Sequence, residues 1–192
     1  MPSLDHPQIE HELDEIVPED RREHLLLVDE DDRVLGVEEK FAAHRSGALH
    51  RAFSVLVYDR EGRWLLQRRS LRKYHSGGLW TNAACGHPRP NETTEAAAGR
   101  RLFEELRFAC PLNFVTKVHY RSALDHGMTE HELVSVYMGT YEGPIDPDPR
   151  EADAVRWIAP ADLTADMTEH PERYTVWFKK YVTELWSSLN AG

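Results

Sequence analysis

The order of elements around residue 85 limits the fold of this chain more than any other feature of its sequence. The short apolar run TNAACGH precedes a loop and the run AAAGRRLFEEL, in which Ala98, Leu102 and Leu106 are spaced as on one face of a helix. Thr93 or Thr94 suits the N-cap of this helix, and the extended run KVHYRSA follows it. A strand, a loop, a helix and a strand in this order predict a sheet with a helix packed on it.

Further β runs continue the pattern from His24 onward. They are HLLLVD and RVLGV around the turn DEDD, RAFSVLVYD and RWLLQRR around a loop that ends at Gly62, ELVSVYMGTY after LDHGMT, and AVRWIA after a proline-rich turn. A second helix is expected after Pro171, where aromatic and aliphatic residues recur at i, i+3 and i+4. The sequence therefore predicts an α+β or α/β domain over residues 24–192, with helices packed against a mixed β-sheet core.

Charge and composition argue against several classes of partner. A net charge of -10 disfavours a broad nucleic-acid surface, and no run approaches the roughly 18 apolar residues of a membrane span. The chain starts with acidic residues, unlike a signal or transit peptide, and its two cysteines allow at most one bridge. We therefore expect a cytoplasmic protein without nucleic-acid or membrane partners. Residues 1–23 hold eight acids and two arginines, which predicts a flexible acidic extension.

Two acids lie on the inward face of a predicted strand. Glu130 and Glu132 precede ELVSVYMGTY with the two-residue period of its apolar side chains, so both carboxyl groups share the core-facing side. Buried carboxylates need a cation, hydrogen-bond donors or a shared proton. The ordinary alternative is that the strand frays into solvent before residue 132.

Three histidines can complete a metal site with these acids. His44 and His50 lie before and at the start of RAFSVLVYD, and His87 shares a face with Cys85 if that segment is extended. Imidazole with carboxylate suits zinc, manganese or iron, and five ligands favour manganese or an expanded zinc site. A single histidine is more often structural, and eleven histidines produce some clusters by chance.

Cys85 has several possible roles. Beside Gly86 and His87, its thiol can be a metal ligand, a nucleophile or an acid/base, whereas a buried cysteine is ordinarily a small apolar side chain. Cys110 keeps that ordinary interpretation. The sequence alone does not choose among the roles of Cys85.

Basic side chains gather between two strands and on the first helix. Arg68, Arg69, Arg72 and Lys73 precede the loop 76–78, which suits an anion such as a phosphate, although a charge run usually faces water. Arg101 and Glu105 are four residues apart on the predicted helix. They form either an ordinary ion pair, or a site in which Glu105 holds a metal carrying phosphates that Arg101 contacts.

Part of this region resembles a degenerate Nudix box. The spacing of that family is followed by Gly86, by Glu92 after five further residues, and by RRLFEELRF after seven more. In the family, a strand, loop and helix use glutamates to hold divalent metal on a diphosphate. Arg101 replaces the first glutamate of the usual Arg-Glu pair, and Arg107 replaces a glycine. These departures argue against ordinary Nudix hydrolysis.

A narrower resemblance accounts for the departures. The motifs EKFAAH, ALHRAFS, LLQRRSLRK, LWTNAACGHP, RRLFEEL and EHE resemble type I isopentenyl diphosphate isomerase, in the same order and over about residues 24 to 180. The resemblance implies an α/β/α Nudix-like fold and a manganese or zinc ion on His44, His50, His87, Glu130 and Glu132. It also implies magnesium on the substrate diphosphate, held by Glu105 and the backbone carbonyl of Cys85. Lys40, Arg69, Lys73 and Arg101 align with positions that contact the diphosphate.

The activity implied by this resemblance is the interconversion of isopentenyl and dimethylallyl diphosphate by a 1,3-allylic proton shift. Cys85 lies on one side of the allyl unit, and Glu132, hydrogen-bonded to Tyr120, lies on the other. Trp177 aligns with the family's carbocation-facing tryptophan, and Trp80 is expected in the pocket wall. Glu104, which the isomerase pattern does not require, is either an additional surface-facing residue or a remnant of the Nudix box. A Nudix diphosphohydrolase or a noncatalytic, metal-dependent phosphate-binding module is the alternative. We expect a monomer or a weak homodimer.

Overall fold

The computed structural model describes residues 23–73 and 75–189, so the predicted extension 1–23 lies outside the described residues except for Glu23. The strands are β1 His24–Val28, β2 Val34–Glu39, β3 His50–Tyr58, β4 Trp64–Arg69, β5 Trp80–Thr81, β6 Ala84–Gly86, β7 Asn113–Ala123, β8 Thr129–Thr140 and β9 Ala152–Ile158. The α-helices are α2 Lys40–Ser46, α3 Thr94–Leu106, α4 Pro160–Glu169 and α5 Val176–Leu189, and the 3-10 turns are η2 Asp125–Gly127 and η3 Pro171–Arg173.

All strands within the described ranges join one mixed sheet built around β3. β3 pairs in parallel with β8 and antiparallel with β6, and it also contacts β1 and β4. β7 extends the sheet beyond β8, and β9 pairs with β4. Because β3 and β8 run parallel, their beginnings lie together, and His50 is the register partner of Glu132.

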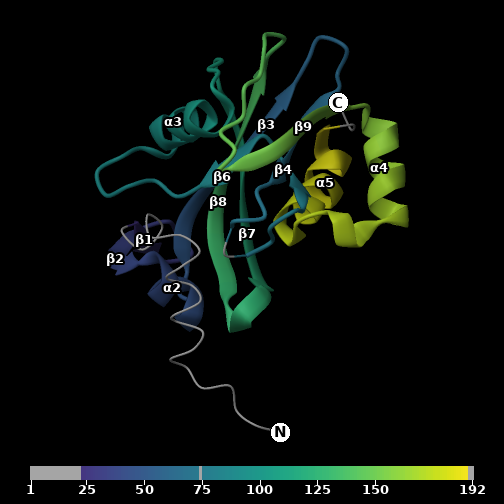
Figure 1. Ribbon diagram of the computed structural model, residues 1–192. Coiled ribbons are helices and arrows are strands. Elements are labelled where there is room, and N and C mark those ends of the chain that lie inside the picture. Colours follow the sequence, from purple (N-terminus) through teal and green to yellow (C-terminus); the bar gives the residue numbers. More distant parts are fainter. Residues whose placement is uncertain (1–22, 74, 190–192) are drawn as a thin grey trace, which may run out of the picture.

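The two faces of β3 are covered by different helices (Figure 1). Ala52 and Leu56 point to the face that packs against α5, whereas Phe53, Val55 and Val57 point to the face that packs against α3. This alternation follows from the two-residue period of a strand. It confirms the predicted mixed sheet sandwiched between helices.

The predicted helices form where their capping and apolar residues indicate. Thr93 is the N-cap of α3, since its hydroxyl accepts a hydrogen bond from the Ala96 amide at 3.2 Å. Ala98, Leu102 and Leu106 are completely buried. α5 follows Pro171 as expected but begins at Val176.

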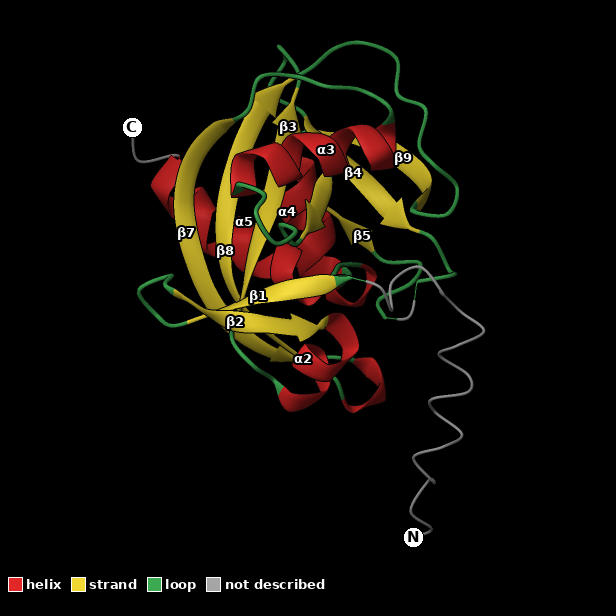
Figure 2. Cartoon of the chain, turned by 90° about the vertical axis from the view of Figure 1, so that its left-hand side faces the viewer, coloured by secondary structure: helices red, strands yellow, loops and turns green. Residues whose placement is uncertain are grey.

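Other features differ from the sequence-based expectation. The run TNAACGH forms two short strands, β5 and β6, because Asn82 between them donates its side-chain amide to backbone carbonyl groups. The helices α2 and α4 were not predicted, since α2 has seven residues and Leu163 is the buried residue of α4. Figure 2 shows α2 and the β1–β2 hairpin below the long strands. None of the described helices has the length and apolar content needed to cross a membrane.

Candidate active site

A cavity of about 1470 Å³ collects most of the side chains singled out from the sequence. The predicted site residues that line it are Lys40, His44, Arg69, Lys73, Cys85, His87, Arg101, Glu105, Tyr120, Glu130, Glu132 and Trp177. His50 lies just behind the wall, completely buried, with its ring centroid 4.8 Å from that of His44 and 5.0 Å from that of His87. We call His44, His50, His87, Glu130 and Glu132 the histidine end, and Arg69, Lys73, Arg101, Glu105 and Glu151 the anion end.

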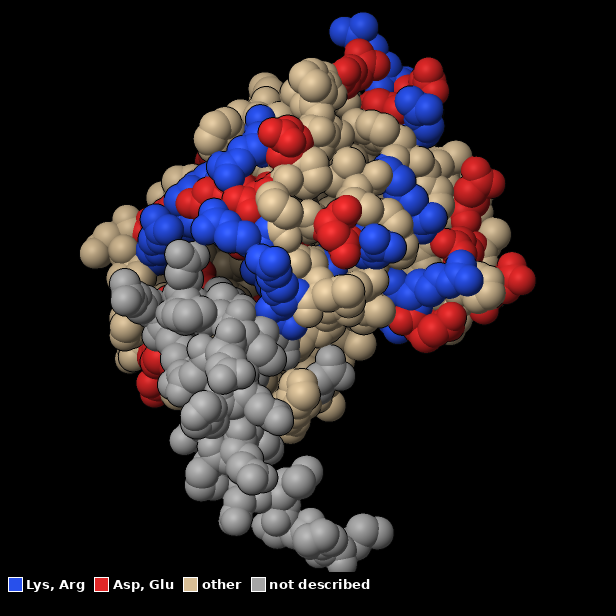
Figure 3. Space-filling model, in the orientation of Figure 1, with Lys and Arg blue, Asp and Glu red and all other residues tan. Residues whose placement is uncertain are grey.

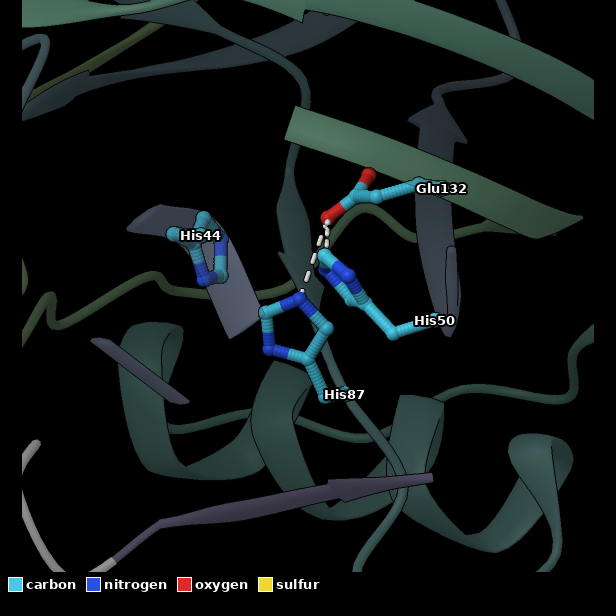
Figure 4. A group of neighbouring side chains, drawn as sticks. All are labelled: His44, His50, His87 and Glu132. Atoms are coloured by element: carbon cyan, nitrogen blue, oxygen red, sulfur yellow. Dashed lines mark hydrogen bonds and ion pairs between the residues drawn. The ribbon is translucent and has the colours of Figure 1, made fainter. Parts of the chain in front are cut away.

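Three imidazoles converge on one carboxylate at the histidine end (Figure 4). His44 comes from α2, His50 from β3, and His87 follows β6, and one ligand atom from each lies within 4.8 Å of the others and of a Glu132 oxygen. His87 Nε2 lies 3.0 Å from Glu132 Oε1, and His50 Nε2 lies 3.5 Å from it. The parallel pairing of β3 with β8 therefore creates the core of this cluster.

The state of these histidines fits metal binding. His44 Nδ1 donates to the Lys40 carbonyl at 2.7 Å and His50 Nδ1 donates to the Ala48 carbonyl at 2.8 Å, which leaves the Nε2 lone pairs for a ligand. Burial lowers the pKa of His44 to about 3, so this ring is neutral near pH 7, and burial also lowers the pKa of His87. His50 Nε2 has no hydrogen-bond partner among the described residues. A buried set of three histidines and a glutamate is compatible with a divalent metal.

Glu130, the fifth predicted ligand, lies behind this cluster. Tyr120 Oη lies 2.8 Å from Glu130 Oε2 and 2.7 Å from Glu132 Oε2, so one phenol joins the two carboxyl groups. Burial and the charge of Glu132 raise the pKa of Glu130 well above its usual range. Burial would also raise the pKa of Glu132, but the neighbouring imidazoles of His50 and His87 hold it well below its usual range. The alternative of a frayed strand is wrong, because β8 begins at Thr129 and both glutamates are buried.

Cys85 and Trp177 line the cavity beside the histidine end. Burial raises the pKa of the Cys85 thiol to about 12, with the charges of Glu105 and Glu132 acting in the same direction. Cys85 therefore keeps its proton near neutral pH, which suits an acid better than a thiolate ligand or nucleophile. The ring of Trp177 lies 5.8 Å from that of His75 in an edge-to-face contact, and the Arg69 guanidinium lies 5.2 Å from its centroid.

The anion end is held together by ion pairs. Lys73 Nζ lies 2.5 Å from Glu151 Oε2, and Arg101 contacts both Glu151, at 3.0 Å, and Glu105, at 2.9 Å. Burial would raise the pKa of Glu151, but Arg101 and Lys73 lower it to about 2. The Nε atom of Arg69 is buried without a hydrogen-bond partner among the described residues. Cations in this arrangement can bind an anion.

The Nudix-like segment keeps part of its ion-pair network. Arg100 donates to Glu92 at 2.7 and 2.8 Å and lies 3.1 Å from Glu104, which also accepts from Arg101 at 3.0 Å. Glu104 is therefore a partly buried member of this network. Figure 3 shows basic and acidic side chains intermixed over the region of α3.

Two sequence-based placements need correction. Arg68 points away from the cavity and pairs with Asp153 at 2.7 Å, because neighbouring residues of a strand face opposite sides. The prediction that Trp80 lies in the pocket wall is wrong, since its ring lies 4.4 Å from the Arg156 guanidinium and does not line the cavity.

Several residues of the site were missed by sequence reasoning. Glu23 pairs with Lys40 at 2.6 Å, Gln67 donates to Glu105 at 2.6 Å, Glu151 pairs with the cations of the anion end, and His75 packs against Trp177. Glu23 and Glu151 lie in segments without a chemical motif. His75 had a signal, because it lies directly before the loop 76–78 considered for anion binding.

Comparisons with known proteins agree with this arrangement. The NUDIX domain family matches residues 48–178. The isopentenyl-diphosphate Delta-isomerase of Burkholderia multivorans is 50% identical over 156 residues, covering 81% of this chain and 89% of that protein. The protein of the same name from Serratia proteamaculans is 45% identical over 163 residues, covering 85% of this chain and 91% of that protein.

Solved structures show the same fold. A crystal structure of a Deinococcus radiodurans protein superposes with a TM-score of 0.65 at 20% identity, covering 77% of this chain and 90% of that one. The crystal structure of a MutT NUDIX hydrolase from Burkholderia pseudomallei superposes with a TM-score of 0.57 at 24% identity, covering 71% of this chain and 98% of that one. With the NUDIX match and the curated relatives, this chain belongs to the isopentenyl-diphosphate Delta-isomerase family of Nudix-domain proteins.

Proposed function

We propose that this protein is an isomerase that interconverts isopentenyl and dimethylallyl diphosphate, a step that supplies isoprenoid precursors. The observation that carries the proposal is the identity of 45 to 50% with relatives bearing this name, over most of both chains. Cys85, whose thiol pKa is raised to about 12, and Glu132, whose carboxyl pKa is held well below its usual range, line the same cavity and support it. We place the protein in the cytoplasm as a monomer or weak homodimer with a small-molecule partner.

The substrate's two parts match the two ends of the cavity. Lys40 and the cations of the anion end bind the diphosphate, while Glu105 and the backbone carbonyl of Cys85 would hold the magnesium that accompanies it. His44, His50, His87 and Glu132, joined by Glu130, would hold one manganese or zinc ion. When bound, that ion would supply positive charge that stabilises the Glu132 carboxylate.

The proposed reaction needs a proton donor and a proton acceptor on opposite sides of the allyl unit. Cys85 provides one of these groups, and Glu132 with Tyr120 provides the other. One group adds a proton to the terminal alkene carbon, which leaves positive charge on the tertiary carbon. The other group removes a proton from the carbon two positions away, so the double bond moves and no electron is gained or lost.

The positive charge requires a pocket that excludes water and presents electron-rich surface. Trp177 is almost completely buried and lines the cavity, so its ring can face the charged carbon. Tyr120 and Tyr181, whose rings lie 6.4 Å apart edge to face, also line the cavity. Their low exposure limits competing addition of water.

The test is proton NMR of the protein with isopentenyl diphosphate and magnesium in deuterated water. We expect the dimethylallyl isomer to form with deuterium incorporated and no phosphate released. Phosphate release without isomer would indicate the Nudix diphosphohydrolase, and unchanged substrate with metal-loaded protein would indicate the phosphate-binding module.

The two cysteines give a matched pair of variants for the same assay. Cys85→Ala should reduce turnover by several orders of magnitude, because it removes a group that transfers a proton. Cys110→Ala should leave turnover near normal, since Cys110 packs with the α3 side of the core and does not line the cavity. Equal activity of the two variants would contradict the role assigned to Cys85.

A further inference from the structure

A group of buried polar side chains connects Trp177 to the strand that carries Cys85. The indole Nε1 of Trp177 donates to Thr81 Oγ1 at 2.9 Å, and the Thr175 hydroxyl donates to the same oxygen at 3.0 Å. Thr81 donates its own hydrogen to Asn82 Oδ1 at 2.9 Å. Thr81 Oγ1 therefore accepts two hydrogen bonds and donates one, which is its full capacity.

Asn82 continues the group to the backbone next to Cys85. Its Nδ2 donates to the Ala84 carbonyl at 2.6 Å and to the Val55 carbonyl at 3.2 Å. Val55 and Ala84 are register partners of β3 and β6, and the Ala84 carbonyl belongs to the peptide bond that leads into Cys85. The side chain thus joins the two strands at the position from which Cys85 enters the cavity wall.

These polar side chains lie where the fold alone would favour apolar ones. Thr81, Asn82 and Thr175 have no exposed surface, and neither Thr81 nor Asn82 lines the cavity. A buried polar group is stable only when each donor and acceptor is satisfied, so such a group fixes the orientation of its members. Trp177 is fixed by its N–H in addition to the packing of its ring.

We propose that Thr81 and Asn82 are positioning residues of the isomerase, which hold the indole of Trp177 and the thiol of Cys85 in a set relation across the cavity. The proposal rests on the proposed roles of Cys85 and Trp177. Neither positioning residue touches substrate, and their effect passes through the two residues they orient. A small displacement of reacting groups can reduce the rate by about 100-fold.

The start of α5 has a separate backbone anchor, which separates positioning from folding. The Thr175 amide donates to the Trp80 carbonyl at 3.0 Å, and Trp80 also forms a parallel bridge with Tyr174. These backbone contacts do not use the Thr81 hydroxyl. A variant without that hydroxyl should therefore keep α5 in place while the indole loses its orientation.

The test compares Thr81→Val, which keeps the shape of the side chain without its hydroxyl, with Thr81→Ser, which keeps the hydroxyl. Thr81→Val should lower kcat by about 10- to 100-fold with KM changed by less than about threefold, because the phosphate contacts are untouched. Thr81→Ser should keep kcat within about threefold of the value for the unsubstituted protein. Thr175→Val is the control, since it removes a bond to Thr81 and leaves the indole bond intact.

A spectroscopic measurement without substrate reports the hydrogen bond itself. The five tryptophans give five indole N–H signals in a nitrogen-proton correlation spectrum, and Trp177→Phe identifies the signal of Trp177. That signal should shift upfield in Thr81→Val and stay in place in Thr81→Ser. If Thr81→Val fails to fold, Thr81→Ala, which also lacks the hydroxyl in a smaller side chain, takes its place.

Two results would overturn the proposal. One is a normal kcat in a folded Thr81→Val protein whose Trp177 signal has shifted, and the other is an equal loss of kcat in Thr81→Val and Thr81→Ser. Failure of the proposed function looks different, because the unsubstituted protein would then form no dimethylallyl isomer in the deuterated-water assay. The indole signal would still show whether Thr81 holds Trp177.

Discussion

The two ends of the cavity treat charge in different ways. At the anion end, Lys73 and Arg101 form ion pairs with Glu151, Arg101 also contacts Glu105, and burial raises the pKa of Glu105. At the histidine end, burial lowers the pKa of His44 and His87, and the pKa values of Glu130 and Glu132 are shifted in opposite directions.

The difference indicates a division of labour. The cations of the anion end can bind an anion through charge-assisted hydrogen bonds, which suits recognition of a diphosphate. Groups whose pKa values are driven apart by burial and neighbours suit proton transfer. Changes at the anion end should therefore alter KM, and changes at the histidine end should alter kcat.

The largest effect is expected at the histidine end. Glu132→Gln should lower kcat by about 100- to 10,000-fold, because the amide cannot accept the proton that the carboxylate accepts. Steady-state kinetics with metal analysis of the purified variant checks this. Glu142→Gln, at an exposed site paired with Arg60, is the control, and near-normal kcat in Glu132→Gln would contradict the division.

A smaller effect is expected for Arg69→Ala at the anion end. Loss of a charge-assisted contact should raise KM by about tenfold or more with a lesser change in kcat. Arg68→Ala is a matched control, because the neighbouring guanidinium faces Asp153 outside the cavity. An unchanged KM with a collapsed kcat would remove Arg69 from the anion end.

The ion pairs of the anion end should also make stability depend on pH. The pKa of Glu151 is about 2 in the folded protein and about 4.5 ordinarily, so its contribution is present above about pH 4.5 and is lost as pH falls toward 2. Glu151→Gln should lower the free energy of unfolding at pH 7 by about 1 to 3 kcal/mol. Denaturant titrations should show this difference closing between pH 4.5 and pH 2, and a constant difference would contradict the assignment.

The smallest effect is expected at the C-cap of α3, at a residue that belongs to neither end. Arg107 has a φ of 60°, where a side chain is strained, and it pairs with Asp148 at 2.7 Å. Arg107→Gly relieves strain and loses the ion pair, so the free energy of unfolding should change by less than about 1 kcal/mol. Arg107→Ala loses the pair and keeps the strain, so thermal denaturation should rank it below Arg107→Gly; the reverse order would contradict this account.

Local patterns predicted the parts of the molecule that depend on one segment. The two-residue period of β8 placed Glu130 and Glu132 inward, and the threonine before α3 marked its N-terminus. The roles of these residues in the reaction stay predictions. The family followed from several motifs in a fixed order, and the comparisons confirm it.

Contacts between distant segments could not be predicted from the sequence. Glu151 comes from a turn with no motif, and only the pairing of β9 with β4 brings it to Lys73. Strand periodicity predicts that the side chains of Arg68 and Arg69 point in opposite directions. The prediction of one basic cluster did not use this rule. Asn82 interrupts its strand through bonds to carbonyls that a local pattern does not specify.

The parallel pairing of β3 with β8 has a consequence for the order of folding. A parallel pair cannot close through a tight turn, and here β4, β5, β6, α3 and β7 lie between the two strands along the chain. His50 and Glu132 therefore meet through a contact of long sequence separation, which forms slowly compared with the local hairpins. Partly folded chains should lack the assembled histidine end even after the β1–β2 hairpin and α3 have formed, so this site arises only at a late stage of folding.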